Sequence, residues 1–256
     1  MLSNDQIDHY HREGYVFPDY ELPAQTLEQI RSAHDRLLAN NPDHPEFRDN
    51  CSALLKFDFG FLNFALNADI LDMAEQLIGP DIALWNMSFF AKPAHNGKRT
   101  PWHQDGQYWP IRPLATCTVW IAIDDATVEN GCMRFVPGSH RPARLMGHDQ
   151  RDDDSLTLQQ ELKEHEYDDS KAVNVELKAG QISLHDIYLA HGSEVNTSGS
   201  PRRGMTLRLM PTTSLYDRNL AANMYVERGG ASMADHPLML MRGTERHGEN
   251  DYQVRR

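Results

Sequence analysis

Cysteine is scarce in this chain of 256 residues, which carries only Cys51, Cys117 and Cys132. An odd number of cysteines without zinc-type spacing argues against a disulfide scaffold and against a cysteine-bound zinc. We therefore expect reduced thiols in a cytoplasmic protein. Positive charge is also in short supply, because 25 Lys and Arg stand against 37 Asp and Glu, for a net charge of −12. Nucleic-acid binding needs clustered Lys and Arg, so no nucleic-acid partner is expected.

The sequence also lacks long uncharged apolar runs, internal repeats and low-complexity linkers. Without such a run no membrane-spanning helix is expected, and residues 1–6 do not have the basic-then-apolar pattern of a signal peptide. The length suits one domain over residues 1–256 with a sizeable core. Within it we expect a helical part at about 1–80, a β core at about 81–212 and a tail at 213–256 that could cover a site. No heptad or self-pairing surface predicts an oligomeric state.

Periodicity and turn residues predict helices first and strands later. Ser3 is suited to cap a helix that ends at Gly14, Pro23 opens a second helix to about Leu38, and a third covers 69–77. Short strands rich in β-branched and aromatic residues are predicted over 82–92, 116–123, 132–136, 173–177, 181–185 and 204–210. Many short strands separated by turn signals indicate a sandwich or barrel. We predict an α+β, mostly β, fold with helices on one side of a β core.

Two short stretches carry the residue types of a metal site. In Trp102-His103-Gln104-Asp105-Gly106, the histidine and the aspartate are two apart, so on a β-strand they would project from the same face. His191, followed by Gly192 and Ser193, could reach the same point from another strand. Two histidines and one carboxylate on one side of a metal are the ligand set of non-haem iron(II) oxygenases, which leave the opposite side open.

At these positions the sequence resembles the phytanoyl-CoA dioxygenase-like (PhyH) family of Fe(II)/2-oxoglutarate oxygenases. The resemblance covers about residues 5–212 and is densest over 100–210. It is carried by residues 102–106, Tyr108-Trp109-Pro110, residues 119–126 and 129–140, His191-Gly192-Ser193, Asn196, Ser198 and Pro201-Arg202-Arg203. Together these motifs are specific for the family, but they do not specify a substrate.

The resemblance implies a double-stranded β-helix, which is a jelly-roll or cupin-like barrel of two facing sheets, with iron at one mouth. His103, Asp105 and His191 match the family's iron ligands. Arg202 matches the basic residue that pairs with the distal carboxylate of 2-oxoglutarate, and a guanidinium offers that group two parallel donors. Arg203 is the alternative, because neighbouring residues on a strand point to opposite faces.

Further contacts to 2-oxoglutarate are expected from the same resemblance. Ser193 would add a hydroxyl near the distal carboxylate, and Trp120 matches a tryptophan that lines the pocket, although a core tryptophan on a central strand explains it equally well. Asn86 and Ser88 interrupt an apolar strand on which buried polar groups need partners, and the family places cosubstrate contacts there. Lys56 could approach the same pocket.

The substrate cannot be named from the sequence. For the wall of its pocket we expect Gln107, Trp109, Arg112 and Tyr216, with Phe59 and Phe61 from the N-terminal part. Arg112 could bind a substrate anion, although a solvated or salt-bridged arginine is the simpler interpretation. No basic patch suits the phosphates of a long acyl-CoA, so a small polar metabolite or a natural-product intermediate is favoured.

The remaining histidines and one acidic segment have simpler interpretations. We expect His185 at a strand end near the site and His140 in a structural turn. Exposed positions are expected for His95, His148, His165, His236 and His247. Residues 147–170 are strongly acidic. A solvated, partly helical loop between two strands is favoured there over a lid or a partner-facing insertion.

These expectations describe a hydroxylase that uses Fe(II), 2-oxoglutarate and O2 and releases succinate and CO2, with ascorbate of help in vitro. Asp105 favours hydroxylation, because related halogenases have a small residue there, whereas desaturation or cyclisation remain open alternatives. Two competing classes are a non-catalytic metal-binding family member and a cupin-type dioxygenase or isomerase without a 2-oxo acid. The complete ligand set argues against the first, and Arg202 with Ser193 argues against the second.

Overall fold

The computed structural model describes residues 1–228 and 232–252. As predicted, helices come first: α1 (Asn4–Glu13), α2 (Ala24–Asn40) and α5 (Ala68–Ile78) precede the long strand β3 (Ile82–Lys92). Ser3 forms a capping box with Gln6, and Gly14 ends α1 at a φ of 87°, which glycine adopts without steric cost. Between α2 and α5, where apolar residues have no regular spacing, the chain forms only short elements, namely η1 (Pro45–Arg48), β2 (Asn50–Cys51), α3 (Leu54–Phe57), η2 (Phe59–Phe61) and α4 (Leu62–Ala65).

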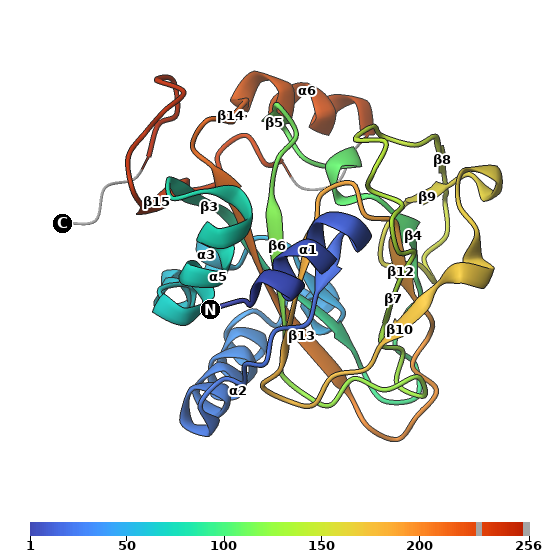
Figure 1. The fold of residues 1–256 in the computed structure, drawn as a ribbon. Coiled ribbons are helices and arrows are strands. Elements are labelled where there is room, and N and C mark those ends of the chain that lie inside the picture. Colours follow the sequence, from blue (N-terminus) through green and yellow to red (C-terminus); the bar gives the residue numbers. More distant parts are fainter. Residues whose placement is uncertain (229–231, 253–256) are drawn as a thin grey trace.

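Two facing antiparallel sheets form the β core (Figure 1). The larger one has the order β1 (Tyr15–Val16), β11 (Ile182–Asp186), β6 (Cys117–Ala122), β13 (Arg202–Pro211), β3 and β15 (Met239–Arg242), with β2 paired to β3. The smaller one has the order β10 (Val173–Val175), β7 (Met133–Phe135), β12 (His191–Ser193) and β4 (Thr100–His103). This arrangement is the predicted double-stranded β-helix with N-terminal helices.

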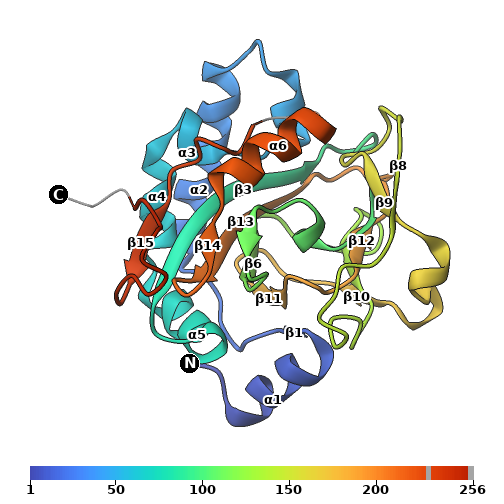
Figure 2. The same cartoon turned by 90° about the horizontal axis from the view of Figure 1, so that it is seen from above.

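The two faces of the larger sheet have different environments (Figure 2). Its outer face packs against α2 and α5 in an apolar cluster that includes Ile30, Leu37, Ile70, Met73, Leu84, Met87, Phe89, Val119 and Leu207. Because side chains alternate along a strand, the residues between these point toward the smaller sheet. They include polar groups on β6 and β13, namely Thr118, Arg202, Thr206 and Arg208, and all four are buried. The interior between the sheets is therefore polar enough to hold a charged ligand.

Two smaller pairs of strands lie outside these two sheets. β5 (Ile111–Arg112) pairs with β14 (Leu215–Tyr216), and β8 (His148–Gln150) pairs with β9 (Gln160–Leu162). The acidic segment therefore contains a hairpin, followed by η4 (Glu164–Glu166) and η5 (Asp169–Lys171). Helix α6 (Arg218–Arg228) follows β14.

Two further sequence expectations can be compared with the structure. The three cysteines are free and buried, as expected for reduced thiols. Among residues 1–228 and 232–252, no helix has the length and apolarity required to cross a bilayer.

Candidate active site

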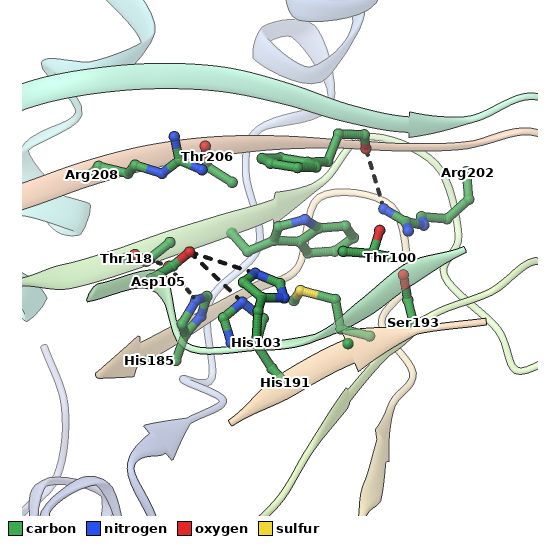
Figure 3. Close-up of a pocket in the computed structure, with 14 residues that line it drawn as sticks. Thr100, His103, Asp105, Thr118, His185, His191, Ser193, Arg202, Thr206 and Arg208 are labelled. Atoms are coloured by element: carbon green, nitrogen blue, oxygen red, sulfur yellow. Dashed lines mark hydrogen bonds and ion pairs between the residues drawn. The ribbon is translucent and has the colours of Figure 1, made fainter. Parts of the chain in front are cut away.

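His103, Asp105 and His191 converge at one end of the interior (Figure 3). The prediction that His103 and Asp105 share a strand is wrong, because β4 ends at His103 and Asp105 begins the 3-10 turn η3 (Asp105–Gln107). The Gly106 N–H donates to the Ile187 carbonyl at 3.1 Å, which holds this turn in place. His191 lies directly opposite His103 on β12. The three side chains still meet, and their ligand atoms all lie within 4.8 Å of one another.

Both histidines present the ring nitrogen that a metal requires. The Nδ1 atom of His103 lies 2.8 Å from the Pro101 carbonyl, and that of His191 lies 2.9 Å from the Leu189 carbonyl. A carbonyl only accepts, so Nδ1 carries the proton and Nε2 keeps its lone pair. Burial, the leading cause in each case, lowers the pKa of His103 to about 4 and the pKa of His191 well below its ordinary value. Both imidazoles are therefore neutral near pH 7.

The carboxylate of Asp105 is oriented by two neighbours. Its Oδ1 atom lies 3.8 Å from His103 Nε2 and 3.9 Å from His191 Nε2. Its Oδ2 atom accepts a hydrogen bond from the Thr118 hydroxyl at 3.1 Å and lies 3.5 Å from Nε2 of His185. Burial acts to raise the pKa of Asp105, but His185, His191 and the charge of Arg208 outweigh burial and hold that pKa below its usual range. One oxygen is thus fixed and the other faces the histidines.

These three residues fit a divalent metal ion. Two neutral Nε2 lone pairs and one ionised oxygen surround a single point, and all three side chains are buried. Two imidazoles and one carboxylate suit iron(II), whereas soft metals prefer thiolate ligands and calcium prefers oxygen ligands alone. His185 lies beside this point near the end of β11, in the position expected for it.

An inner cavity of about 430 Å³, open mouth included, leads away from the three residues toward Arg202. Figure 3 shows Arg202 at the end of the cavity opposite to Arg208, with Thr100 and Ser193 beside it. The guanidinium donates to the Phe90 carbonyl at 3.2 Å, but its Nε atom is buried without a partner. Burial lowers the pKa of Arg202 to about 10, so the side chain is still a cation at neutral pH. An unpaired buried cation is suited to bind a ligand carboxylate.

Arg203 points the other way, as strand alternation requires. Its guanidinium is bound to Asp124 at 2.8 and 2.9 Å on the outer side of the sheet. Trp120 lines the inner cavity with its ring centroid 5.6 Å from the Arg202 guanidinium, and it also packs in the apolar cluster between the sheets, so both interpretations of this tryptophan are compatible with its position. Gly204 makes room for this indole, because a Cβ atom there would overlap with Trp120 Cε2.

Three expected cosubstrate contacts lie outside the lining of the inner cavity. The Asn86 amide donates to the Ser52 carbonyl at 2.8 Å, and Ser88 accepts a hydrogen bond from Arg208 at 2.9 Å. Lys56 forms an ion pair with Asp235 and lines a surface opening. In the structure Asn86, Ser88 and Lys56 thus bind other residues of the chain, and their contact with the cosubstrate stays a prediction.

An outer cavity of about 1110 Å³, open mouth included, meets the inner one at His103, Asp105, Phe90 and Arg208. Its other lining residues come from β2, β3, the segment after η3, the β8–β9 hairpin and the C-terminal tail, namely Asn50, Ser52, Asn86, Tyr108, Trp109, Gln150, Thr157, Leu158, Gln159, Gln160, Met233 and His236. This cavity is the candidate substrate pocket.

Only Trp109 of the expected substrate-pocket residues lines the outer cavity. The amide of Gln107 donates to Gln160 at 3.1 Å and so supports the wall from behind. Arg112 donates to the carbonyls of Trp109 and Ile111, and the Tyr216 hydroxyl donates to the Met233 carbonyl. These backbone partners turn the last two side chains away from the cavity.

Other expectations about pocket and surface residues need correction as well. Phe61 is buried in the apolar core and Phe59 is 50% exposed, and neither lines the inner or the outer cavity. His236 is buried rather than exposed, and burial is the main reason that its pKa falls to about 3. His148 is half-buried, whereas His95, His165 and His247 are exposed as expected. The acidic segment is part of the pocket, because the β8–β9 hairpin forms one wall.

Sequence reasoning missed Arg208 and the hairpin wall. Arg208 lies on the same face of β13 as Arg202, and the even spacing of the two arginines was the available signal, although the predicted strand began only at residue 204. The hairpin residues carry no chemical pattern of their own, so only the fold brings them to the pocket.

This fold, with two histidines, one aspartate and a buried arginine between its sheets, is typical of the family of non-haem iron oxygenases that use 2-oxoglutarate. The sequence profile of the family described as phytanoyl-CoA dioxygenase (PhyH) matches residues 10–204. The chain belongs to this family.

Curated relatives agree with this assignment. A phytanoyl-CoA dioxygenase domain-containing protein 1 homolog of Caenorhabditis briggsae is 35% identical over 218 residues, which is 82% of this chain and 69% of that protein. The homolog of Dictyostelium discoideum is 32% identical over 152 residues, or 59% of this chain, and the match spans only 54% of that protein. An ectoine dioxygenase of Bordetella bronchiseptica is 27% identical over 78% of this chain and 73% of its own length.

Solved structures show the same fold. The non-heme monooxygenase ThoJ superposes with a TM-score of 0.76 at 23% identity, over 98% of this chain and 88% of the other. The carbocyclase SnoK of nogalamycin biosynthesis gives a TM-score of 0.70 at 24% identity, over 84% and 86% of the two chains. The epimerase SnoN, in complex with Fe3+, alpha ketoglutarate and nogalamycin RO, gives 0.69 at 23% identity over 96% and 95%. The fold thus serves several reaction types.

Proposed function

We propose that this protein is an Fe(II)- and 2-oxoglutarate-dependent dioxygenase that hydroxylates an unactivated carbon of a small-molecule metabolite. The observation that carries the proposal is the convergence of His103, Asp105 and His191 at the junction of two cavities, one of which ends at Arg202. The inner cavity suits a diacid that reaches from the metal to the arginine, and the outer cavity suits the substrate.

The residues of the chain have distinct roles in this proposal. His103, Asp105 and His191 would hold iron(II) on one side, and Arg202 with Ser193 would bind the distal carboxylate of 2-oxoglutarate. When bound, iron, 2-oxoglutarate and O2 would supply an oxidant that removes hydrogen from carbon and returns a hydroxyl group; one oxygen atom of O2 enters the product and the other enters succinate, with CO2 released. Thr118 orients Asp105, and the buried walls exclude water from the reacting carbon.

The experiment that tests this function measures succinate from protein supplied with Fe(II), ascorbate and 2-oxoglutarate. We expect slow succinate release without substrate, and His191→Ala should abolish it because one metal ligand is lost. His165→Ala is the matched control, since His165 is exposed and remote from the inner cavity, and it should behave as wild type. Equal release by wild type and His191→Ala would contradict the ligand assignment.

The reaction outcome is tested with a metabolite library and mass spectrometry. Hydroxylation predicts a product that gains one oxygen only when 2-oxoglutarate is present. Loss of two hydrogens instead would identify desaturation or ring closure at the same site.

A further inference from the structure

Arg208 is a buried cation for which the proposed cofactors provide no partner. It lies on β13 and is 7% exposed, and it lines both the inner and the outer cavity. Its Nη1 atom donates to the Ser88 hydroxyl at 2.9 Å, whereas its Nε atom is buried without a hydrogen-bond partner. Within the described part of the chain, no carboxylate lies within ion-pair distance of it, and Asp105 acts on its charge only from farther away. A buried charge of this kind is costly unless a ligand pairs with it.

Three aromatic rings hold the guanidinium in place. It lies 4.9 Å from the ring centroid of Trp109, 5.5 Å from that of Phe90 and 5.7 Å from that of Trp85. Cation–π contacts of this kind stabilise the charge and fix the orientation of the group. The aromatic side chains cannot accept the strong hydrogen bonds that a guanidinium offers, so its donors remain available to a ligand.

Charge balance points to the substrate rather than to the cofactors. The charges of iron(II), Arg202, Asp105 and the 2-oxoglutarate dianion cancel. Among the described residues that line the two cavities, Asp105 is the only Asp or Glu, and Arg202 and Arg208 are the only Arg or Lys. The guanidinium of Arg208 is therefore left uncompensated, on the side of the metal site away from Arg202 (Figure 3).

The outer cavity adds uncharged polar groups to this single cation. Its walls carry carboxamides and hydroxyls, among them Asn50, Gln159 and Gln160, and its apolar surface comes from aromatic and aliphatic side chains such as Trp109 and Met233. One guanidinium matches a singly charged carboxylate, whereas a phosphate dianion or a polyphosphate would call for more cations. Most of these carboxamides already form hydrogen bonds within the chain, as Gln159 does with Asp153 and Gln160 with Gln107. The Oδ1 atom of Asn50, in contrast, is buried without a hydrogen-bond partner, so it suits an amide or hydroxyl donor on the ligand.

We propose that the substrate is a small carboxylic acid whose carboxylate pairs with Arg208 and whose amide or hydroxyl group donates to Asn50 in the outer cavity. This inference rests on the proposed function, because it assigns the substrate class of that same site. Since Arg208 and Asp105 line the same junction, the carbon that is oxidised lies near the carboxylate in the substrate's own structure.

The test is a binding measurement on the full chain with Fe(II) and 2-oxoglutarate in the absence of oxygen. N-acetylleucine and N-acetylleucinamide differ only in the charged group, and butyl phosphate supplies the alternative anion. Binding is followed by the change each probe causes in the visible absorption of the iron–2-oxoglutarate complex. We expect the acid to bind about 10- to 100-fold more tightly than the amide, which is the range of a hydrogen bond to a charged group.

Variants assign the effect to a single side chain. Arg208→Gln should remove most of the preference for the acid, and Arg208→Lys should restore part of it, because lysine keeps the charge but not the planar donors. Arg112→Gln is the matched control, since that arginine lies near the outer cavity but donates to backbone carbonyls. Arg202→Gln should instead weaken the binding of 2-oxoglutarate.

Three other results would overturn the inference, and a fourth would overturn the proposed function. If Arg208→Gln weakens the binding of 2-oxoglutarate as much as Arg202→Gln does, Arg208 binds the cosubstrate and the inference is overturned. Tighter binding of butyl phosphate overturns the carboxylate class, and equal binding of acid and amide to wild type overturns the inference even if the variants do not fold. If wild type gives no iron–2-oxoglutarate absorption, the proposed function fails first, which distinguishes the two failures.

Discussion

Replacing Thr118 by valine removes one hydroxyl and keeps the shape of the side chain. That hydroxyl donates to Oδ2 of Asp105 at 3.1 Å, and both residues are buried. A hydrogen bond to a charged group contributes about 1.5–3 kcal/mol. We therefore expect Thr118→Val to lower the free energy of unfolding of the metal-free protein by about this amount, because the buried carboxylate loses a donor that water cannot replace.

The same change should weaken metal binding. Residues that orient a metal ligand typically contribute 10- to 100-fold to affinity, about the range that 1.5–3 kcal/mol would give. Urea denaturation of the metal-free protein measures the first effect, and competition for Fe(II) or Co(II) against a coloured chelator measures the second.

Thr116 offers a control close by on the chain. It is 2% exposed, and its hydroxyl is buried without a hydrogen-bond partner. Thr116→Val therefore removes an unsatisfied group and should leave metal affinity unchanged, with stability equal or slightly higher. If both valine variants behave alike in both measurements, the orienting role of Thr118 is refuted.

Three further predictions concern other parts of the molecule. Burial, and then the charge of Arg203, lower the pKa of His34 from 6.5 to about 4. On acidification the unfolded chain therefore protonates this imidazole before the folded protein does. About 3 kcal/mol of the free energy of unfolding should be present above pH 6.5 and lost as the pH falls to 4. Urea midpoints should show a flatter profile over that window for His34→Leu. Gly204→Ala should cost about 1–3 kcal/mol through overpacking against Trp120, again measured with urea, and a cost near zero would contradict that contact. Arg202→Lys should raise the dissociation constant of 2-oxoglutarate about 10- to 100-fold, whereas the same change at Arg203 should not, as calorimetric titration can check.

Local patterns made much of the fold predictable. The caps at Ser3 and Gly14 and the run of β-branched and aromatic residues over 82–92 act through neighbours in the chain, and those elements formed where the sequence indicated. The order of strands in the two sheets does not follow from such patterns, because β13 lies between β6 and β3 although the three are far apart in the chain. For that step the family resemblance supplied the information.

The candidate site also has a part that the sequence predicted and a part that it did not. The positions of His103, Asp105, His191 and Arg202 follow from motifs, and the structure brings all four to one interior space. The substrate wall was predicted poorly: Arg112 and Tyr216 point elsewhere because backbone carbonyls satisfy them. Which carbonyl lies within reach of a side chain depends on tertiary packing, and a single sequence does not reveal it.

The origin of the outer cavity's walls has an evolutionary consequence. The metal-binding residues come from β4, β12 and the turn after β4, within the paired sheets, whereas the β8–β9 hairpin and residues near 233–236 supply much of the opposite surface. Insertions or exchanges in those two peripheral segments can therefore change which molecules fit the outer cavity while His103, Asp105 and His191 keep their positions. Relatives with this fold can therefore differ in substrate while they share the same metal-binding residues.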